Sequence, residues 1–168
     1  MKNSKKQMFQ KATFAGGCFW GMEYQFQKLN GIVQTRVGYT GGKTKNPTYE
    51  QVCSDKSGHA EAVEVTFDSE KISYEKLLEV FWKSHDPTTM NMQWPDIGSQ
   101  YRSAIFYHNI EQKKAAEKSL KEIQKKITKK IVTEITKASE FYAAEEHHQD
   151  YVKNHGVGSC HIARNPYL

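Results

Sequence analysis

Residues 16–21, with the sequence Gly-Gly-Cys-Phe-Trp-Gly, constrain the fold most, because two glycines allow a sharp turn between a strand and a helix. A strand-like run precedes them at 11–15, and an apolar stripe with helical spacing follows at 19–29. This order places Cys18 in the first turn of a helix. Free amide groups and the positive end of the helix dipole lie there, so we expect a lowered thiol pKa at Cys18. A small cysteine buried in a core turn is the alternative interpretation.

The run 59–67 is the second informative stretch. Val63, Val65 and Phe67 alternate, so they share one face of a strand, and Glu61 is in phase with them. Burial of a carboxylate without a partner costs free energy, which raises its pKa and suits it to act as a general acid. The alternative is that Glu61 lies at a frayed strand end and points to water.

The spacing of apolar residues predicts one α+β domain over 1–168, a two-layer α/β sandwich. Its sheet is mixed or antiparallel and ferredoxin-like, with helices packed on it. We expect an N-terminal arm at 1–10 and a flexible, loosely structured C-terminal tail at 154–168 that carries Cys160. The expected strands are 11–15, 32–39, 59–67, 101–107 and 131–136, the expected helices are 19–29, 48–53, 73–85, 110–130 and 140–153, and 86–100 is a long loop.

The formal net charge of +5 comes largely from the lysine-rich helix expected at 110–130. Acidic residues break this run and aromatic residues are not interleaved with it, so we interpret it as a solvated face and not as a nucleic-acid or membrane surface. The basic N-terminus is followed by no apolar segment of a secretory signal. We therefore expect a cytoplasmic monomer.

The three cysteines lie far apart and form no C-x-x-C pair, which argues against zinc and against a secreted disulfide scaffold. Gly156 and Gly158 precede Cys160, so the tail could bring this thiol to Cys18. Cys53 is expected to be a buried or half-buried spectator, with a redox role as the alternative. We expect no metal site, because neighbouring residues such as His147 and His148 do not share a face of a helix.

Several separated motifs resemble those of the type A peptide methionine sulfoxide reductase family. The first is Gly-Cys-Phe-Trp-Gly at 17–21, and the others follow in the family's order and spacing. They are Gly-Tyr-Thr-Gly-Gly at 38–42, Asn-Pro-Thr-Tyr at 46–49, Gly-His-Ala-Glu-Ala-Val at 58–63, Asp-Pro-Thr-Thr at 86–89 and Gln-Tyr-Arg-Ser at 100–103. The match runs from about residue 11 to residue 161, so it covers nearly the whole chain.

The resemblance implies reduction of methionine S-sulfoxide, free or in proteins, to methionine. Cys18 would attack the sulfoxide sulfur and Glu61 would protonate the oxygen, to which Tyr49 and Tyr101 would hydrogen-bond. The sulfenic acid left on Cys18 would react with Cys160 to form a disulfide, which thioredoxin or another dithiol would reduce. This chemistry implies no bound cofactor.

The same resemblance implies the substrate-binding residues. Phe19 and Trp20 would hold the methyl group of the methionine, and Asp96 and Gly17 would line the pocket with them. The sequence departs from the usual family pattern before Asp96, where Trp94 replaces a less bulky segment. We expect Trp94 to narrow or extend the rim of the pocket.

Two other classes of function remain open at this level. In one, Cys18 works with a histidine as an acyl-transfer or hydrolase nucleophile, which predicts turnover without a reductant. In the other, Cys18 and Cys160 form a non-enzymatic redox switch that peroxide oxidises directly.

Overall fold

The computed structural model describes residues 8–168, so most of the arm expected at 1–10 lies outside the described residues. Phe9 and Gln10 do not belong to an arm, because they begin the first strand. The strands are β1 (Phe9–Ala15), β2 (Ile32–Thr40), β3 (Ala60–Asp68), β4 (Met92–Gln93), β5 (Asp96–Ile97), β6 (Ala104–Tyr107), β7 (Glu134–Lys137) and β8 (Tyr142–Ala143). The helices are α1 (Phe19–Gln27), α2 (Tyr49–Cys53), α3 (Tyr74–Lys83), α4 (Ile110–Gln124) and α5 (Tyr151–His155), with 3-10 turns η1 (Ser99–Tyr101), η2 (Glu146–His148) and η3 (Val157–Ser159).

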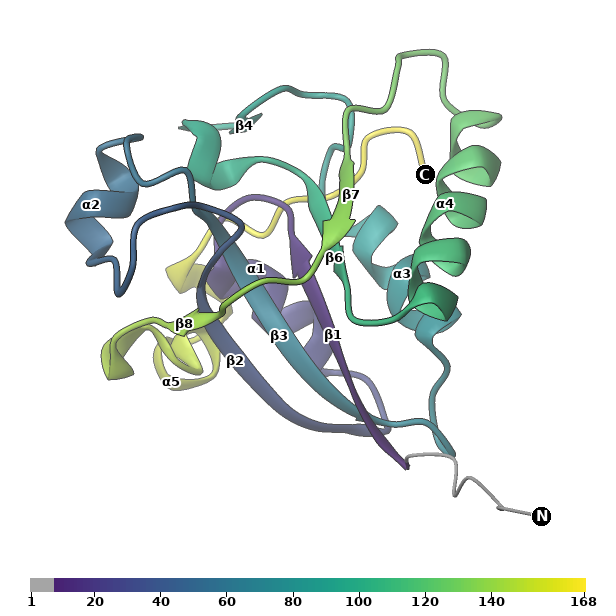
Figure 1. Ribbon diagram of the computed structural model, residues 1–168, viewed down its shortest axis with the longest axis horizontal. Helices are drawn as coiled ribbons and strands as arrows, with labels where there is room; N and C mark the ends of the chain where they lie inside the picture. Colours follow the sequence, from purple (N-terminus) through teal and green to yellow (C-terminus); the bar gives the residue numbers. More distant parts are fainter. Residues whose placement is uncertain (1–7) are drawn as a thin grey trace.

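The described residues form a six-stranded sheet in the order β7-β6-β1-β3-β2-β8 (Figure 1). Its pairs are antiparallel except for β6 and β7, which run parallel. The chain order β1-α1-β2-β3-α3-β6 and the spatial order β6-β1-β3-β2 are those of a ferredoxin-like fold. The mixed sheet and the fold class expected from the sequence are confirmed.

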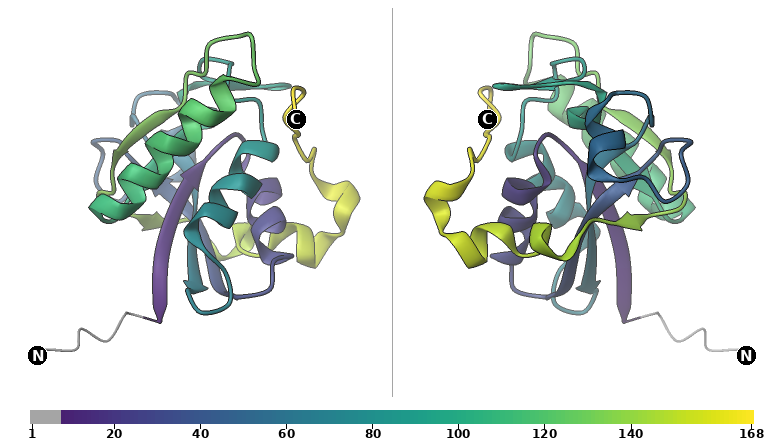
Figure 2. Two further views of the ribbon diagram at one scale, coloured as in Figure 1. Left: turned by 90° about the vertical axis from the view of Figure 1, so that its right-hand side faces the viewer. Right: turned by 90° about the vertical axis from the view of Figure 1, so that its left-hand side faces the viewer.

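Helices α1, α3 and α4 bury their apolar faces in one core on one face of this sheet (Figure 2). Phe14 of β1 lies at its centre and is fully buried. Its ring stacks on Phe26 of α1 and Phe81 of α3 with ring centroids 5.1 and 5.2 Å apart, and on Tyr74 at 6.0 Å. One side chain therefore joins both helices to the central strand.

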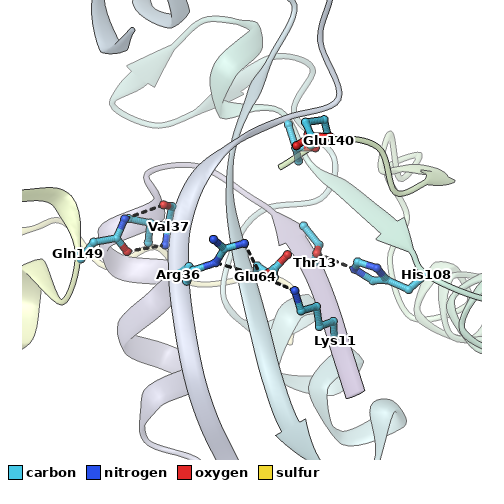
Figure 3. A network of polar contacts seen from close by, with 9 residues as sticks. Lys11, Thr13, Arg36, Val37, Glu64, His108, Glu140 and Gln149 are labelled. Atoms are coloured by element: carbon cyan, nitrogen blue, oxygen red, sulfur yellow. Dashed lines mark hydrogen bonds and ion pairs between the residues drawn. The ribbon is translucent and has the colours of Figure 1, made fainter. Parts of the chain in front are cut away.

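The opposite face of the sheet carries a row of polar side chains (Figure 3). Glu64 of β3 pairs with Thr13 of β1 on one side and with Arg36 of β2 on the other. The Arg36 guanidinium bonds its carboxylate at 2.8 Å and the Lys11 ammonium lies at 3.4 Å, while Thr13 is hydrogen-bonded to His108. The strand alternation that puts Glu64 and Glu61 on different faces is thus confirmed.

The prediction of a helix over 140–153 is wrong. The segment instead holds β8, η2 and α5, because two side chains after His148 favour other contacts. The Gln149 amide bonds both the N–H and the C=O of Val37 at 2.9 Å (Figure 3). Asp150 has a φ of 53°, a left-handed conformation that ends any continuous helix. Tertiary contacts therefore override the local pattern here.

Three other expected boundaries differ from those in the structure, and side-chain hydrogen bonds explain the first of them. Helix α4 ends at Gln124 and not at residue 130, because the Gln124 side chain bonds the backbone of Ile127, Lys129 and Ile131 and turns the chain. The expected strand at 131–136 is displaced to β7, and the one at 101–107 is shortened to β6.

The tail after α5 has little regular structure beyond η3, as expected. It is nevertheless fixed at its far end by Asn165, which is buried. The Asn165 side chain donates to the carbonyl of Trp82 at 2.8 Å and its backbone N–H donates to the carbonyl of Lys83 at 3.0 Å. The end of α3 thus holds the tail beside the sheet.

In residues 8–168, no helix combines the length and the apolar character that crossing a membrane requires.

Replacement of Phe14 by Ala tests the central packing contact. We expect Phe14→Ala to lower the free energy of unfolding by about 3–5 kcal/mol, because the cavity would abut both α1 and α3. Urea denaturation of the reduced protein measures this loss. Phe9→Ala is the matched control, since Phe9 lies on the same strand but is 47% exposed. A similar loss in both variants would contradict the central role of Phe14.

Candidate active site

Cys18 lies at the start of α1, as its sequence context predicts. It is the N-cap residue of the helix, and Gly17 before it has a φ of 92°. A side chain on Gly17 would be strained in this conformation, and its Cβ would lie 2.9 Å from Cγ of Gln93. The glycine turn therefore leads from β1 into α1 and leaves the Cys18 thiol half-buried.

Glu61 lies beneath this turn at the start of β3 and is only 2% exposed. The backbone N–H of Phe19 in the first turn of α1 donates to Oε2 of Glu61 at 3.2 Å. Burial raises the pKa of Glu61 from 4.5 to about 8, with smaller upward contributions from Asp96 and Cys160, while the Phe19 N–H opposes the shift. The interpretation of Glu61 as exposed is wrong, and its carboxyl keeps a proton near neutral pH.

The lowered pKa expected for Cys18 is wrong for this state. The hydrogen bond with Cys160, burial and the charge of Glu61 all raise the pKa of the Cys18 thiol, and only the Trp20 N–H opposes them. The helix N-terminus does supply an amide, but the Phe19 N–H binds Glu61 and not the sulfur. The carboxyl thus takes one donor of the helix terminus, the Phe19 N–H, while the Trp20 N–H acts on the thiol.

Cys160 lies close to Cys18 even though both thiols are free. Their Sγ atoms are 4.0 Å apart, so a disulfide bond of about 2.05 Å requires an approach of about 2 Å. The hydrogen bond with Cys18 and the N–H of Gly21 lower the pKa of Cys160. The tail therefore already holds the second thiol next to the first.

Tyr49 and Tyr101 both lie close enough to Glu61 to sense its charge. The hydrogen bond to Cys53, then burial and the charges of Cys53 and Glu61, raise the pKa of Tyr49. Burial, then Glu61 and Asp96, raise the pKa of Tyr101. Both phenols consequently stay protonated and can donate hydrogen bonds near the carboxyl.

The two aromatic residues after Cys18 have different environments. The Phe19 ring is buried in the core against Tyr39, with centroids 5.8 Å apart. The Trp20 ring is half-buried and stacks on Tyr151 of α5 at 3.7 Å and 7°. Its indole Nε1 donates to Nδ1 of His148 at 3.1 Å. The C-terminal segment thus fixes the orientation of Trp20.

Glu145 and His148 are site residues that sequence reasoning missed. The Glu145 carboxylate accepts from the Tyr39 hydroxyl at 3.1 Å and from the Tyr49 N–H at 3.3 Å, and it lies 3.7 Å from Nε2 of His148. Burial lowers the pKa of His148, which keeps Nδ1 free to accept from Trp20. The i, i+3 spacing of these two residues is the signal that could have found them.

Cys18 also lines a small hollow that has room for little more than one water molecule. The rim hairpin, residues 92–97, contributes Trp94 and Asp96 to its wall, and the tail contributes His161. Burial raises the pKa of Asp96, and the charge of His161 opposes this shift. The hollow is therefore bounded by the reactive turn, the rim hairpin and the tail.

Cys53 is exposed, so the expectation of a buried or half-buried side chain is wrong. It lies at the end of α2, where its thiol hydrogen-bonds to Tyr49. Within residues 8–168, no group of three or more His, Cys, Asp or Glu side chains could hold a metal ion.

The raised pKa of Glu61 predicts a pH-dependent stability. Between pH 4.5 and about 8 the unfolded chain releases this proton while the folded chain keeps it, so rising pH favours unfolding. We expect the wild type to lose up to about 1.4 kcal/mol of stability per pH unit in this window relative to Glu61→Gln. Urea denaturation of both proteins from pH 5 to 8 measures the difference. Glu79→Gln is the control, because the Glu79 carboxylate is exposed and bonded by Lys76 and Lys83, and this variant should keep the pH dependence of the wild type. Parallel stability profiles for wild type and Glu61→Gln would contradict the argument that burial raises the pKa of Glu61.

Comparisons with known proteins agree with this geometry. The family model described as peptide methionine sulfoxide reductase matches residues 10–168. The peptide methionine sulfoxide reductase MsrA of Methanothermobacter thermautotrophicus is 52% identical over 158 residues, which cover 93% of this chain and 94% of that protein.

Solved structures show the same fold. Mxr1 from Saccharomyces cerevisiae in reduced form has a TM-score of 0.86 and 34% identity, covering 94% of this chain and 91% of that chain. Mxr1 in complex with Trx2 has a TM-score of 0.63 and 26% identity, covering 95% and 93% of the two chains. On the strength of the family match over nearly its whole length, the chain belongs to the peptide methionine sulfoxide reductase family.

Proposed function

We propose that this protein reduces methionine S-sulfoxide, free or within polypeptides, to methionine with electrons from thiols. One observation carries the proposal. The Cys18 thiol lies 4.0 Å from a second thiol, and a buried carboxyl that holds its proton to about pH 8 lies beside it. A nucleophile, a resolving thiol and an acid are the three groups that this reaction needs.

In the first step, Glu61 donates its proton to the sulfoxide oxygen, which is a poor leaving group until it is protonated. The Cys18 sulfur attacks the sulfoxide sulfur, and its own proton passes to the Glu61 carboxylate. The S–O bond and the transient bond between the two sulfurs then break as the hydroxyl moves to Cys18, which leaves a sulfenic acid on Cys18 and releases methionine. The methionine sulfur gains two electrons, the Cys18 sulfur loses two, and Glu61 ends the step protonated.

The surrounding side chains have matching roles in this proposal. Tyr49 and Tyr101 donate hydrogen bonds to the sulfoxide oxygen, because both remain neutral beside Glu61. Trp20, which is oriented by His148, contacts the methyl group of the substrate. Phe19 forms the buried base of the substrate site.

Asp96 and Gly17 complete the proposed substrate site. Asp96 supplies its polar side from the rim hairpin. Gly17 binds no group through a side chain, and its role is to let the backbone approach closely beneath the rim hairpin.

In the second step, the Cys160 thiol attacks the sulfenic sulfur of Cys18. A disulfide forms and the hydroxyl leaves as water with the Cys160 proton. A dithiol then reduces this disulfide by exchange. We propose thioredoxin as that dithiol, with no bound prosthetic group, on the ground that yeast Mxr1 has been solved in complex with Trx2.

The same chemistry suits a single-domain monomer in the cytoplasm, where dithiol reductants return such cysteines to the free thiols that the structure holds. Acyl transfer by a Cys–His pair is less well supported, because among the described residues the hydrogen-bond partner of the Cys18 thiol is Cys160 and not a histidine.

The decisive experiment measures reduction of a peptide containing methionine S-sulfoxide or R-sulfoxide, with thioredoxin as reductant. We expect turnover of the S epimer only, and its loss in Cys18→Ser by at least about a thousandfold, since the attacking sulfur is removed. Cys53→Ser is the matched control and should retain turnover, because serine preserves a hydrogen-bonding group next to Tyr49. The proposal fails if the folded, reduced wild type turns over neither epimer.

Cys160→Ser separates the two steps. This variant should release about one equivalent of methionine per protein in a single turnover and accumulate a sulfenic acid on Cys18. Turnover with thioredoxin should fall by at least about tenfold, because exchange acts on a disulfide that this variant cannot form. Quantified methionine release and labelling of the sulfenic acid by a dimedone probe check both statements. Thioredoxin-dependent turnover at the wild-type rate would exclude Cys160 as the resolving thiol.

A further inference from the structure

Trp94 differs from the other two tryptophans of the chain because most of its ring faces water. Trp82 is 1% exposed in the core, and Trp20 is stacked on Tyr151, whereas Trp94 is 74% exposed. An indole is one of the largest apolar surfaces that a side chain offers. Exposure of a single apolar ring is ordinary in itself, but this ring also lies on the wall of the hollow that Cys18 lines.

The rim hairpin holds Trp94 in a defined place. Gln93, next to it, is 4% exposed, and its amide bonds both the N–H and the C=O of Asp86. The Gln93 side chain also lies against Gly17, where any Cβ would collide with it. The base of the hairpin is thus held against the turn that carries Cys18, and Trp94 projects from this fixed base.

Trp94 and Cys18 line the same small hollow. Consecutive residues of an extended chain are spaced by about 3.3–3.6 Å. When a methionine sulfoxide within a polypeptide reaches Cys18, the residues directly before and after it therefore lie at the edge of this hollow. A free methionine sulfoxide has no such neighbours and leaves the indole uncovered.

The chemistry of the indole ring determines which kind of side chain, next to the methionine sulfoxide, it would bind. An apolar side chain placed on the ring removes apolar surface of both groups from water. A cationic side chain can also bind the face of an indole. A cation must give up part of its hydration to bind there, whereas an apolar side chain gains by leaving water, so we favour an aromatic or aliphatic side chain.

We propose that Trp94 is a specificity-determining residue that binds an apolar side chain adjacent to the methionine sulfoxide of a polypeptide substrate. The role rests on the proposed function and names the substrate class more closely. It makes sulfoxides in apolar segments of polypeptides better substrates than sulfoxides next to polar residues.

The test compares three blocked tripeptides in which the methionine S-sulfoxide is flanked on both sides by Phe, by Ser or by Lys. Dithiothreitol serves as reductant, so contacts with thioredoxin do not enter. We expect the wild type to favour the Phe peptide over the Ser peptide by about tenfold in kcat/KM, mainly through KM. In Trp94→Ala this ratio should fall to about one, and Trp94→Phe should restore most of it.

Ile97→Ala is the matched control. Ile97 is 71% exposed on the same hairpin, but it does not line the hollow, so the Phe-to-Ser ratio should stay at the wild-type value. Because the effect is a ratio between two substrates of one variant, general damage to the chemistry cancels.

The role of Trp94 is overturned if Trp94→Ala keeps the wild-type ratio, if Ile97→Ala loses it equally, or if the Lys peptide is the preferred substrate. If the wild type reduces all three peptides equally well, the role of Trp94 is refuted and the proposed function is not. Absence of turnover of any S-sulfoxide by the wild type refutes the proposed function and this role together.

Discussion

The hydrogen bond from the Phe19 N–H to the Glu61 carboxyl is the contact on which the arrangement of the site depends. It joins the first turn of α1 to the first residues of β3, two elements that the core packs together through Phe14 and its neighbours. The glycine turn places Cys18 one residue before this donor. The nucleophilic sulfur and the buried acid are therefore set side by side by one backbone amide.

This contact also explains the protonation of the resting site. The amide partly stabilises the charged form of Glu61, but burial dominates and keeps the proton on the carboxyl to about pH 8. Cys18 loses the benefit of that amide and shares a hydrogen bond with Cys160, which holds its proton as well. A site with both groups protonated suits a reaction in which a proton enters with the acid and another returns to it. In the proposed reaction, attack by Cys18 is then coupled to the arrival of a sulfoxide oxygen and does not depend on a thiolate present beforehand.

The C-terminal third of the chain completes the site from a distance in sequence. Glu145 accepts hydrogen bonds from Tyr39 and Tyr49, and His148 orients Trp20. Asn165 anchors the tail beyond Cys160 to the end of α3. The second thiol is thus held 4.0 Å from the first, and only a short approach would bring it to a sulfenic acid formed on Cys18. In contrast, the rim hairpin projects from its buried root and offers its exposed side chains to whatever enters the hollow.

The sequence by itself determined the ferredoxin-like order of elements, the place of Cys18 at a helix start and the inward face of Glu61. These features follow from local periods of two or 3.6 residues and from glycines that permit one kind of turn, so they are readable without long-range contacts. Tertiary structure alone decided which group receives the amide of Phe19, and it set the direction in which the pKa of Cys18 moves through the contact with Cys160 and burial. It also decided that residues 140–153 form no continuous helix, because partners more than 100 residues away in the sequence hold Glu145 and Gln149. Such pairings depend on which surfaces the fold brings together, and no local pattern encodes that choice.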